Sequence, residues 1–507
     1  MKSLIRFSLL LLLPVLSVAQ QRTVIHIEQA KIQRYDAALG KDVEKLLGNV
    51  ILRQDSTWFY CDSAYLNDKT RNFDAFGHVH IKVSDTLHIY GDKLRYTGDS
   101  RLAEIFEHVK MVDDSSVLET NYLLFNRFTQ VAHYPNHGTI TRGDNLLKSK
   151  RGYYRSDLKE FYFADDVELI NPEYTIYTDT MTFHTRTDIA YFFGPTLIRG
   201  EENTIYCEYG WYDTGKDHAY LSEKTRMNTN EQTISSDKLF YDRNIGFGDA
   251  AGNVIVTDTL NKLIVYGETG KIWEDEGRSY VTDSARFVSY DSSDSLFMHA
   301  DTLFMFFNAE RKAEKMMAYY GVRFFRTNIQ GICDSLVYHT TDSTLRLYHY
   351  PILWSDNNQL TADSMYIINQ HGQLDSLIMH NNAFIVAKDS IKGYNQIKGK
   401  NMIGYFFENE LNQIFVDGNA QTIYWVREED GSLIGVNLAQ SSTMKIYLED
   451  SNISDIRYFT NPGEVMYPEE ELPEEQSILR GFQWLDDLRP KDKHDLYRRE
   501  ETDTSEK

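Results

Sequence analysis

Apolar positions recur along the chain with a period of about 29 residues. The register is set by Asp92 as position zero in the segment Ile89-Tyr90-Gly91-Asp92-Lys93-Leu94-Arg95-Tyr96. The equivalent positions are Asp62, Asp92, Asn121, Lys150, Asp179, Glu208, Asp237, Glu268, Asp301, Asp334 and Asp363. Such self-similarity is typical of repeat architectures, in which each unit packs on its neighbours.

The residues around position zero repeat as well. Position −3 is apolar, position −1 is small, position +2 is mostly apolar and position +4 is mostly aromatic, as in Ile89, Gly91, Leu94 and Tyr96. Positions −3 and −1 share one face of a strand, and positions +2 and +4 share the face of opposite parity. Both pairs can reach one core only if the strand bends or bulges near position zero.

A second motif follows about 15 residues after position zero, as in Gly48-Asn49-Val50-Ile51-Leu52 and Gly252-Asn253-Val254-Ile255-Val256. Gly-Asn favours a turn, and the alternation after it indicates a half-buried strand. A third apolar patch precedes the turn, so the pattern predicts about three short strands per repeat. We therefore expect an all-β, elongated stack of repeats with an apolar interior and polar corners.

The N-terminus predicts export. A short basic start is followed by an apolar run from Phe7 to Leu16 and by small residues up to Ala19, which favours cleavage of a signal peptide, residues 1–19, before Gln20. The apolar run is too short to span a bilayer comfortably. The mature chain is therefore expected in the periplasm or cell envelope, with no transmembrane segment.

The chain has 507 residues and a formal charge of −22. The length exceeds one ordinary core, and the acidic balance argues against nucleic acid as a partner. The pattern divides the chain into β repeats over 20–200, further repeats of the same stack over 201–425, degenerate terminal strands over 426–460, and an acidic tail over 461–507. Helical spacing of Ile478, Leu479, Phe482, Leu485 and Leu488 predicts a short amphipathic helix in that tail, which either caps the sheet or docks a partner.

Two sets of residues are candidates for special chemistry. Cys61, Cys207 and Cys333 all occupy position −1, so they should lie several layers apart, beyond disulfide reach, as small buried residues. His78, His108 and His137 fall in successive layers, where a stacked column could bind a metal, although a polar ladder at the surface is the favoured interpretation. We expect no metal site.

Aspartates recur at the repeat period, which favours structural corners over a catalytic carboxylate pair. The sequence contains no G-x-S-x-G, P-loop, dinucleotide fingerprint or H-E-x-x-H. The chain is therefore expected to need no cofactor and not to be an enzyme.

The recurring segments Gly48-Asn49-Val50-Ile51-Leu52, Cys61-Asp62-Ser63-Ala64-Tyr65 and Gly91-Asp92-Lys93-Leu94-Arg95-Tyr96 resemble the OstA-like (organic solvent tolerance) family. The resemblance is clearest over residues 24–200 and extends to about residue 425. It covers the LptA-like proteins and the N-terminal domain of LptD-like proteins. It implies an antiparallel β-jellyroll, open along one side, whose groove shields lipopolysaccharide acyl chains in the periplasm.

The resemblance also implies partners, namely lipopolysaccharide or lipid A acyl chains and other Lpt-type envelope proteins joined by pairing of edge strands. This chain carries more layers than its shorter relatives, so one chain could supply in cis a bridge that they build by association. The candidate groove-lining residues are Ile89, Leu94, Tyr96, Leu118, Leu123, Phe125, Leu147, Tyr154, Ile176, Met181, Phe183, Ile205, Tyr212, Ile234, Leu239 and Tyr241.

Two alternatives stay open at this stage. The interior could be a filled core in a closed β-helix, which would favour a structural or adhesive solenoid without lipid cargo. A polysaccharide-active β-helix enzyme would instead require an exposed cluster of carboxylates in a cleft. Glycine at position +2 in Gly152, Gly210 and Gly270 leaves uneven room, which slightly favours a groove.

Overall fold

The computed structural model describes residues 24–35, 40–201, 203–229, 232–290, 294–370, 373–389, 391–428, 430–449 and 452–497. The predicted signal peptide lies outside the described residues. The chain forms two compact units, residues 1–188 (unit 1) and residues 189–507 (unit 2). In the described part of the chain, no helix is both long and apolar enough to cross a membrane.

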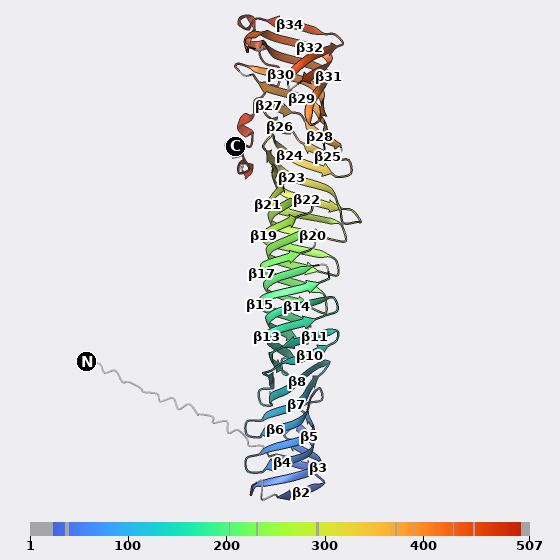
Figure 1. Cartoon of the computed structure of the whole chain (residues 1–507), viewed down its shortest axis with the longest axis vertical. Coiled ribbons are helices and arrows are strands. Elements are labelled where there is room, and N and C mark those ends of the chain that lie inside the picture. The colour runs from blue at the N-terminus through green and yellow to red at the C-terminus, as the bar shows by residue number, and fades with distance from the viewer. Residues whose placement is uncertain are drawn as a thin grey trace, which may run out of the picture. The chain divides into compact units, whose positions relative to one another are not determined.

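Almost every regular element is a strand (Figure 1). Unit 1 contains β1 (His26–Gln29), β2 (Ile32–Tyr35), β3 (Val43–Gln54), β4 (Thr57–Asn67), β5 (Asn72–Lys82), β6 (Leu87–Thr97), β7 (Leu102–Asp113), β8 (Ser116–Asn126), β9 (Val131–Tyr134), β10 (Gly138–Arg142), β11 (Asn145–Ser149), β12 (Arg151–Arg155), β13 (Glu160–Ile170) and β14 (Tyr174–His184). 

Unit 2 continues the same design with longer strands towards its C-terminal end. It contains β15 (Ile189–Gly200), β16 (Thr204–Asp213), β17 (His218–Asn228), β18 (Gln232–Asp242), β19 (Phe247–Asp258), β20 (Leu263–Trp273), β21 (Arg278–Tyr290), β22 (Ser295–Phe307), β23 (Ala313–Arg326), β24 (Ile329–His339), β25 (Thr344–Tyr348), β26 (Ile352–Ser355), β27 (Asn358–Thr361), β28 (Ser364–Gln370), β29 (Gln373–Lys388), β30 (Tyr394–Phe407), β31 (Glu410–Arg427), β32 (Leu433–Glu449), β33 (Asn452–Phe459) and β34 (Gly463–Tyr467). Four 3-10 turns follow, η1 (Glu469–Glu471), η2 (Glu474–Gln476), η3 (Asp486–Leu488) and η4 (Asp495–Tyr497).

The expected bend near position zero is present as a β-bulge. In the pair β3–β4, Gly48 and Asn49 together oppose Asp62, and both have positive φ, 79° and 50°. Two such residues bend a strand without ending it. The prediction of three short strands per repeat was therefore wrong, because Gly-Asn lies inside one long strand. Each repeat consists of two bent strands.

The side chain at position zero contacts the side chain of a bulge residue on the next strand. Asp62 contacts the imidazole of His78 at 2.8 Å, and Asp237 accepts a hydrogen bond from the Asn253 side chain at 2.9 Å. A Cβ atom at Gly77 would lie 2.3 Å from a carboxylate oxygen of Asp62, so the bulge needs glycine there. The periodic aspartates are thus structural corner residues.

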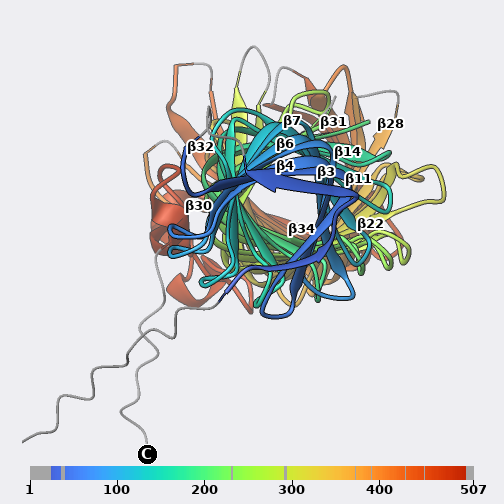
Figure 2. The ribbon, with the colours of Figure 1, turned by 90° about the horizontal axis from the view of Figure 1, so that it is seen from below.

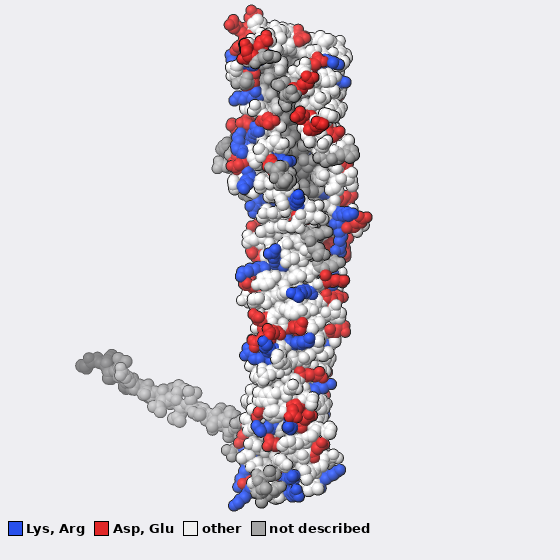
Figure 3. All heavy atoms as spheres, in the orientation of Figure 1, with Lys and Arg blue, Asp and Glu red and all other residues white. Residues whose placement is uncertain are grey.

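Every described strand pairing is antiparallel, and consecutive strands mostly pair with each other. A parallel β-helix is excluded by this pairing. The all-β prediction is confirmed: each unit is an antiparallel jellyroll of bent strands that curve around an interior, as the blue strands of unit 1 show in Figure 2. Charged side chains of both signs are interspersed over the outer face (Figure 3).

The turns between strands form two rows in each unit. In unit 1, rim A consists of the turns after β3, β5, β7, β10 and β13, and rim B consists of those after β4, β6, β8, β12 and β14. In unit 2, rim A consists of the turns after β15, β17, β19, β21 and β23, and rim B of those after β16, β18, β20 and β22. Because each strand is bent at its bulge, the two rims are the free margins of the folded sheet.

The C-terminal tail differs from its prediction. Residues 468–497 contain 3-10 turns but no α-helix, and they lie in extended stretches against the outer face of unit 2, beside β24 to β30 (Figure 1). The apolar spacing that suggested a helix instead places Phe482 and Trp484 against Tyr394, with ring centroids 5.1 and 5.3 Å apart. The tail is called the strap below.

Three buried glutamines on the outer face bind the strap. The Gln396 amide donates to the Ser477 carbonyl (3.0 Å) and accepts from the Leu479 N–H (2.8 Å). Gln359 makes the same pair of bonds to Gln483 and Leu485, at 2.8 and 2.7 Å, and Gln330 accepts from Arg489 at 2.8 Å. Trp354 and Val386, the cross-strand neighbours of Gln359 on the same face, are also buried, at 0% and 1% exposure.

Substitution of Gln359 by leucine should loosen the strap. Both partners of its amide would lose their bond, and each lost hydrogen bond weakens the docked state by about 1 kcal/mol. We expect the Leu485 amide to exchange hydrogen about ten to thirty times faster. The exposed Gln440 of β32 provides the control, because its replacement by leucine should leave that exchange unchanged. Equal exchange in all three proteins would show that Gln359 does not hold the strap.

Candidate functional site

All sixteen candidate groove residues point into the interior, but the exposed fraction of their side chains differs between the two units. The eleven candidates in unit 1 are at most 2% exposed. At position −3, Ile89, Leu118 and Ile176 of unit 1 are 0–1% exposed, whereas Ile205 and Ile234 of unit 2 are partly exposed. Tyr212 and Leu239 of unit 2 are buried as well, at 7% and 6% exposure. The candidates therefore lie in a filled core in unit 1 and in a less tightly buried interior between β16 and β18 of unit 2.

Aromatic side chains fill the interior of unit 1. Phe59, Phe73 and Tyr96 form a cluster with ring centroids 4.9–5.1 Å apart, and Tyr154 stacks on Phe161 at 4.1 Å. Offset and edge-on ring contacts of this kind add to the stability gained by burial. The space beside Gly152 is also occupied, because a Cβ atom there would lie 2.2 Å from the Tyr134 hydroxyl oxygen.

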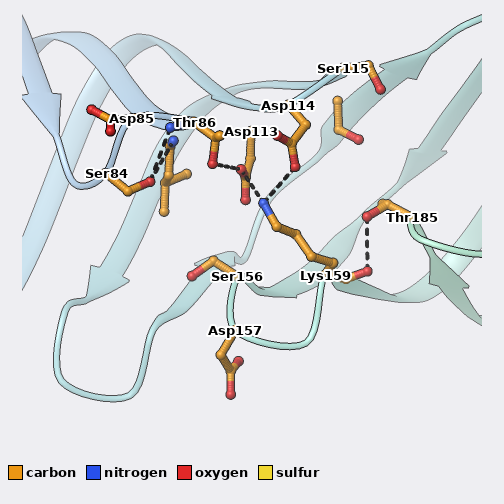
Figure 4. Close-up of polar contacts among 12 residues, drawn as sticks. Ser84, Asp85, Thr86, Asp113, Asp114, Ser115, Ser156, Asp157, Lys159 and Thr185 are labelled. Atoms are coloured by element: carbon orange, nitrogen blue, oxygen red, sulfur yellow. Dashed lines mark hydrogen bonds and ion pairs between the residues drawn. The ribbon is translucent and has the colours of Figure 1, made fainter.

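Side chains also join the two rims of unit 1. At rim A the buried Asp113 accepts a bond from Lys159 of the opposite margin at 2.5 Å (Figure 4). It also accepts a bond from the Tyr154 hydroxyl at 2.6 Å. Asp114 pairs with the same Lys159 at 2.8 Å. Although burial acts to lower the pKa of Lys159, the two carboxylates raise it, so the ammonium stays charged.

A second and a third contact repeat this arrangement. Arg127 of rim B donates to the Gln54 side chain at 2.8 Å and to the Tyr96 hydroxyl at 2.6 Å. Arg142, at the end of β10, donates to Asp188 at 2.8 Å and to the Thr185 carbonyl at 2.5 Å. Unit 1 is thus packed inside and joined along its margins.

The interior of unit 2 between β16 and β22, residues 204–307, is different, and we call it the open section. Small residues are frequent at its inward positions; they are Cys207, Gly210, Ala219, Ser236, Gly248, Ala250, Gly267, Gly270, Ser279, Ala285 and Ala300. Four of them, Cys207, Ser236, Gly267 and Ala300, are at position −1, which is small in unit 1 as well. Their inward neighbours Met227, Val256, Val265, Ile272 and Met305 are only partly buried. An added Cβ atom would lie 3.2 Å from Val254 Cγ1 at Gly270, but 2.6 Å from the Phe192 ring at Gly210 and 2.3 Å from Val281 Cγ1 at Gly267, so neighbouring side chains occupy the space beside these glycines.

Several aromatic residues of the open section point outward, whereas Tyr212, Tyr241 and Phe287 point inward. Trp273 lies 5.4 Å from Phe247 and 5.8 Å from Tyr280, and Tyr280 lies 5.6 Å from Phe304, all between ring centroids on the outer face. This row of rings supplies contacts that the small interior residues do not. These outward ring contacts help to hold the strands of the open section together.

Towards its C-terminal end the interior of unit 2 is filled, and this core already begins in β21 and β22 with Ala285, Phe287, Met298, Ala300 and Leu303, which are 0–9% exposed. The core from β23 to β32 contains Met365, Met402, Val416, Met444 and Ile446, each 0% exposed. Of the residues in the open section, the sequence predicted Ile205, Tyr212, Ile234, Leu239 and Tyr241 as groove-lining. Val265, Ile272 and Ala250 were not among the predicted residues. The repeat register could have found two of them, because Val265 is position −3 and Ile272 is position +4 of the repeat around Glu268.

The cysteines behave as predicted, being free and buried. Burial raises the pKa of all three thiols to about 12. Because the thiolate is the reactive form, a maleimide at pH 8 should label the native protein far more slowly than an unstructured thiol peptide, by at least about a hundredfold. Labelling should reach the peptide rate in denaturant. Rapid native labelling of Cys207 would instead show that the interior of β16 opens.

The histidines lie at the surface. His78 and His108 contact Asp62 and Asp92, and the hydrogen bond and negative charge raise the pKa of each imidazole. Among the described residues no group of three or more His, Cys, Asp or Glu is placed to hold a metal ion.

Comparison with known proteins gives a family. The model for OstA-like protein matches residues 22–179 and 177–288, which together span more than half of the chain. No curated protein matches. The matched segments cover the described part of unit 1 and most of the open section. The chain belongs to the OstA-like protein family.

Proposed function

We propose that this protein carries lipid acyl chains in the open section and serves as a bridge for lipopolysaccharide towards the outer membrane. The observation that supports the proposal is the interior of β16 to β22, which is lined by Gly, Ala and Ser and by partly exposed aliphatic side chains. Membership of the OstA-like family supports a role in the transport of envelope lipids.

The interior can hold an alkyl chain by burial alone. Each CH₂ group removed from water contributes about 0.8 kcal/mol, so a few groups offset the cost of association. The six inter-strand spacings from β16 to β22 give the open section a length of roughly 29 Å. Transfer along such a surface requires no bond to be made or broken, so we propose a carrier and not an enzyme.

The proposed place of action is the periplasm. The basic start, the apolar run to Leu16 and the small residues up to Ala19 support export of the chain. Strands at the ends of the described chain could pair with other envelope proteins. All four residues of β2 and four of the five residues of β34 are exposed, so they offer backbone groups for such pairing.

The proposal is tested by purifying the full chain without detergent and identifying bound molecules by mass spectrometry. We expect lipids with long acyl chains, and added lipopolysaccharide should displace a fluorescent alkyl probe from the protein. A folded protein that carries no lipid and binds no alkyl probe would contradict the proposal.

A second function is favoured by a specific observation. Unit 1 is filled and joined along its margins, which suits a structural spacer of the envelope. If that role applied to the whole chain, alkyl probes would bind neither unit. The same probe experiment therefore separates the two functions.

A further inference from the structure

The charged residues at rim B of the open section bear on which lipid head groups can stay there. Strand ends and turns at 213–217, 242–246, 273–278 and 307–312 form this margin. Seven of their residues are Asp or Glu and five are Lys or Arg, which leaves a net charge of 5 − 7 = −2. A phosphate arriving at this margin meets an excess of carboxylates.

The cations of this margin are already paired. Lys216 lies 3.8 Å from Asp213, and Arg278 lies 2.5 Å from Glu276. Further along the same margin, Arg311 lies 3.7 Å from Glu274 and Lys312 lies 2.9 Å from Glu310. The fifth cation, Arg243, is not free either.

Rim A, the opposite margin of the open section, also has few cations that could bind a phosphate. Lys262, in the turn between β19 and β20, is exposed, and Arg326 pairs with Asp294 at 3.5 Å. Phosphate recognition in proteins depends on several cations or N–H donors that converge on one group. In the described part of this margin, a single exposed lysine does not provide such a set.

We infer that the open section selects its cargo by the acyl chains and disfavours phosphate-bearing head groups. The inference rests on the proposed function, since it concerns the same interior. A phosphate would have to displace a carboxylate from its cation and would be repelled by the remaining acidic residues. Lipids whose head groups are uncharged, or from which phosphate has been removed, are therefore the better ligands.

The test compares two probes with one alkyl chain, dodecyl maltoside and dodecyl phosphate, each below its micelle concentration, on the full chain. At low salt we expect the phosphate to bind about threefold more weakly or worse, and the difference to shrink as salt screens the repulsion. Lys262→Gln should leave both affinities unchanged.

Tighter binding of dodecyl phosphate at low salt would overturn the inference, and so would a loss of phosphate binding in the Lys262→Gln protein. These results would leave the proposed function standing, because both probes would still bind. If neither probe binds the folded protein, the proposed function itself fails. Phosphorylated and dephosphorylated lipid A should then repeat the ranking of the two dodecyl probes where binding is found.

Discussion

Replacement of Ala250 by phenylalanine should abolish most of the binding of an alkyl probe to this protein. Ala250 points into the open section, next to Leu239 and Gly270. A phenyl ring there would occupy room for at least two CH₂ groups of the ligand, each worth about 0.8 kcal/mol. The dissociation constant should therefore rise by about tenfold or more, measured by fluorescence titration.

The neighbouring residue provides a matched control. Ala251 carries the same side chain on the same strand, but it points outward between Lys238 and Thr269. Ala251→Phe should bind the probe like the original protein. A second inward variant, Val265→Trp, guards against misfolding of the first, because Val265 is only partly buried. Equal binding by the inward and outward variants would contradict a ligand site in the interior.

Replacement of Asp113 by alanine should destabilise unit 1 strongly. Asp113 is 3% exposed and accepts bonds from Lys159, Tyr154 and the Thr86 hydroxyl, the last at 2.9 Å. Its loss would leave the Tyr154 hydroxyl buried without that acceptor and would remove one of the two carboxylates beside Lys159. We expect the free energy of unfolding of unit 1 to fall by about 2–3 kcal/mol.

Hydrogen exchange of β7 and β13 in denaturant measures this change within unit 1. Asp114 serves as the control, because it contacts the same Lys159 but its side chain is 53% exposed. Asp114→Ala should cost less than about 1 kcal/mol. Similar losses for both variants would mean that burial of Asp113 does not determine how firmly the rims are joined.

The sequence predicted the repeat and its bend but not the length of the strands. Parity at positions −3 and +2 required a bend near Asp92, and the bulge is there, formed by Glu107 and His108 of β7 opposite Asp92. The Gly-Asn pairs led to a prediction of three strands per repeat where there are two, because the same positive φ angles occur in a turn and in a bulge. Only the cross-strand register distinguishes these two uses.

The strap and the open section depended on contacts between distant residues. The spacing of Phe482 and Leu485 suits a helix. In the structure, however, the Leu485 backbone N–H donates a hydrogen bond to the side chain of Gln359, which lies more than a hundred positions earlier in the sequence. Position −3 is isoleucine at several repeats of both units, so the residue type at this position does not predict how deeply the side chain is buried.

Photocrosslinking from two inward positions tests most directly whether lipid lies in the open section. A photoreactive residue would replace Val265 of the open section in one protein and Ile89 of the filled interior of unit 1 in another. After loading with lipopolysaccharide, we predict a lipid adduct from position 265 and none from position 89. Adducts of equal yield from both positions, or an adduct from position 89 alone, would contradict this account.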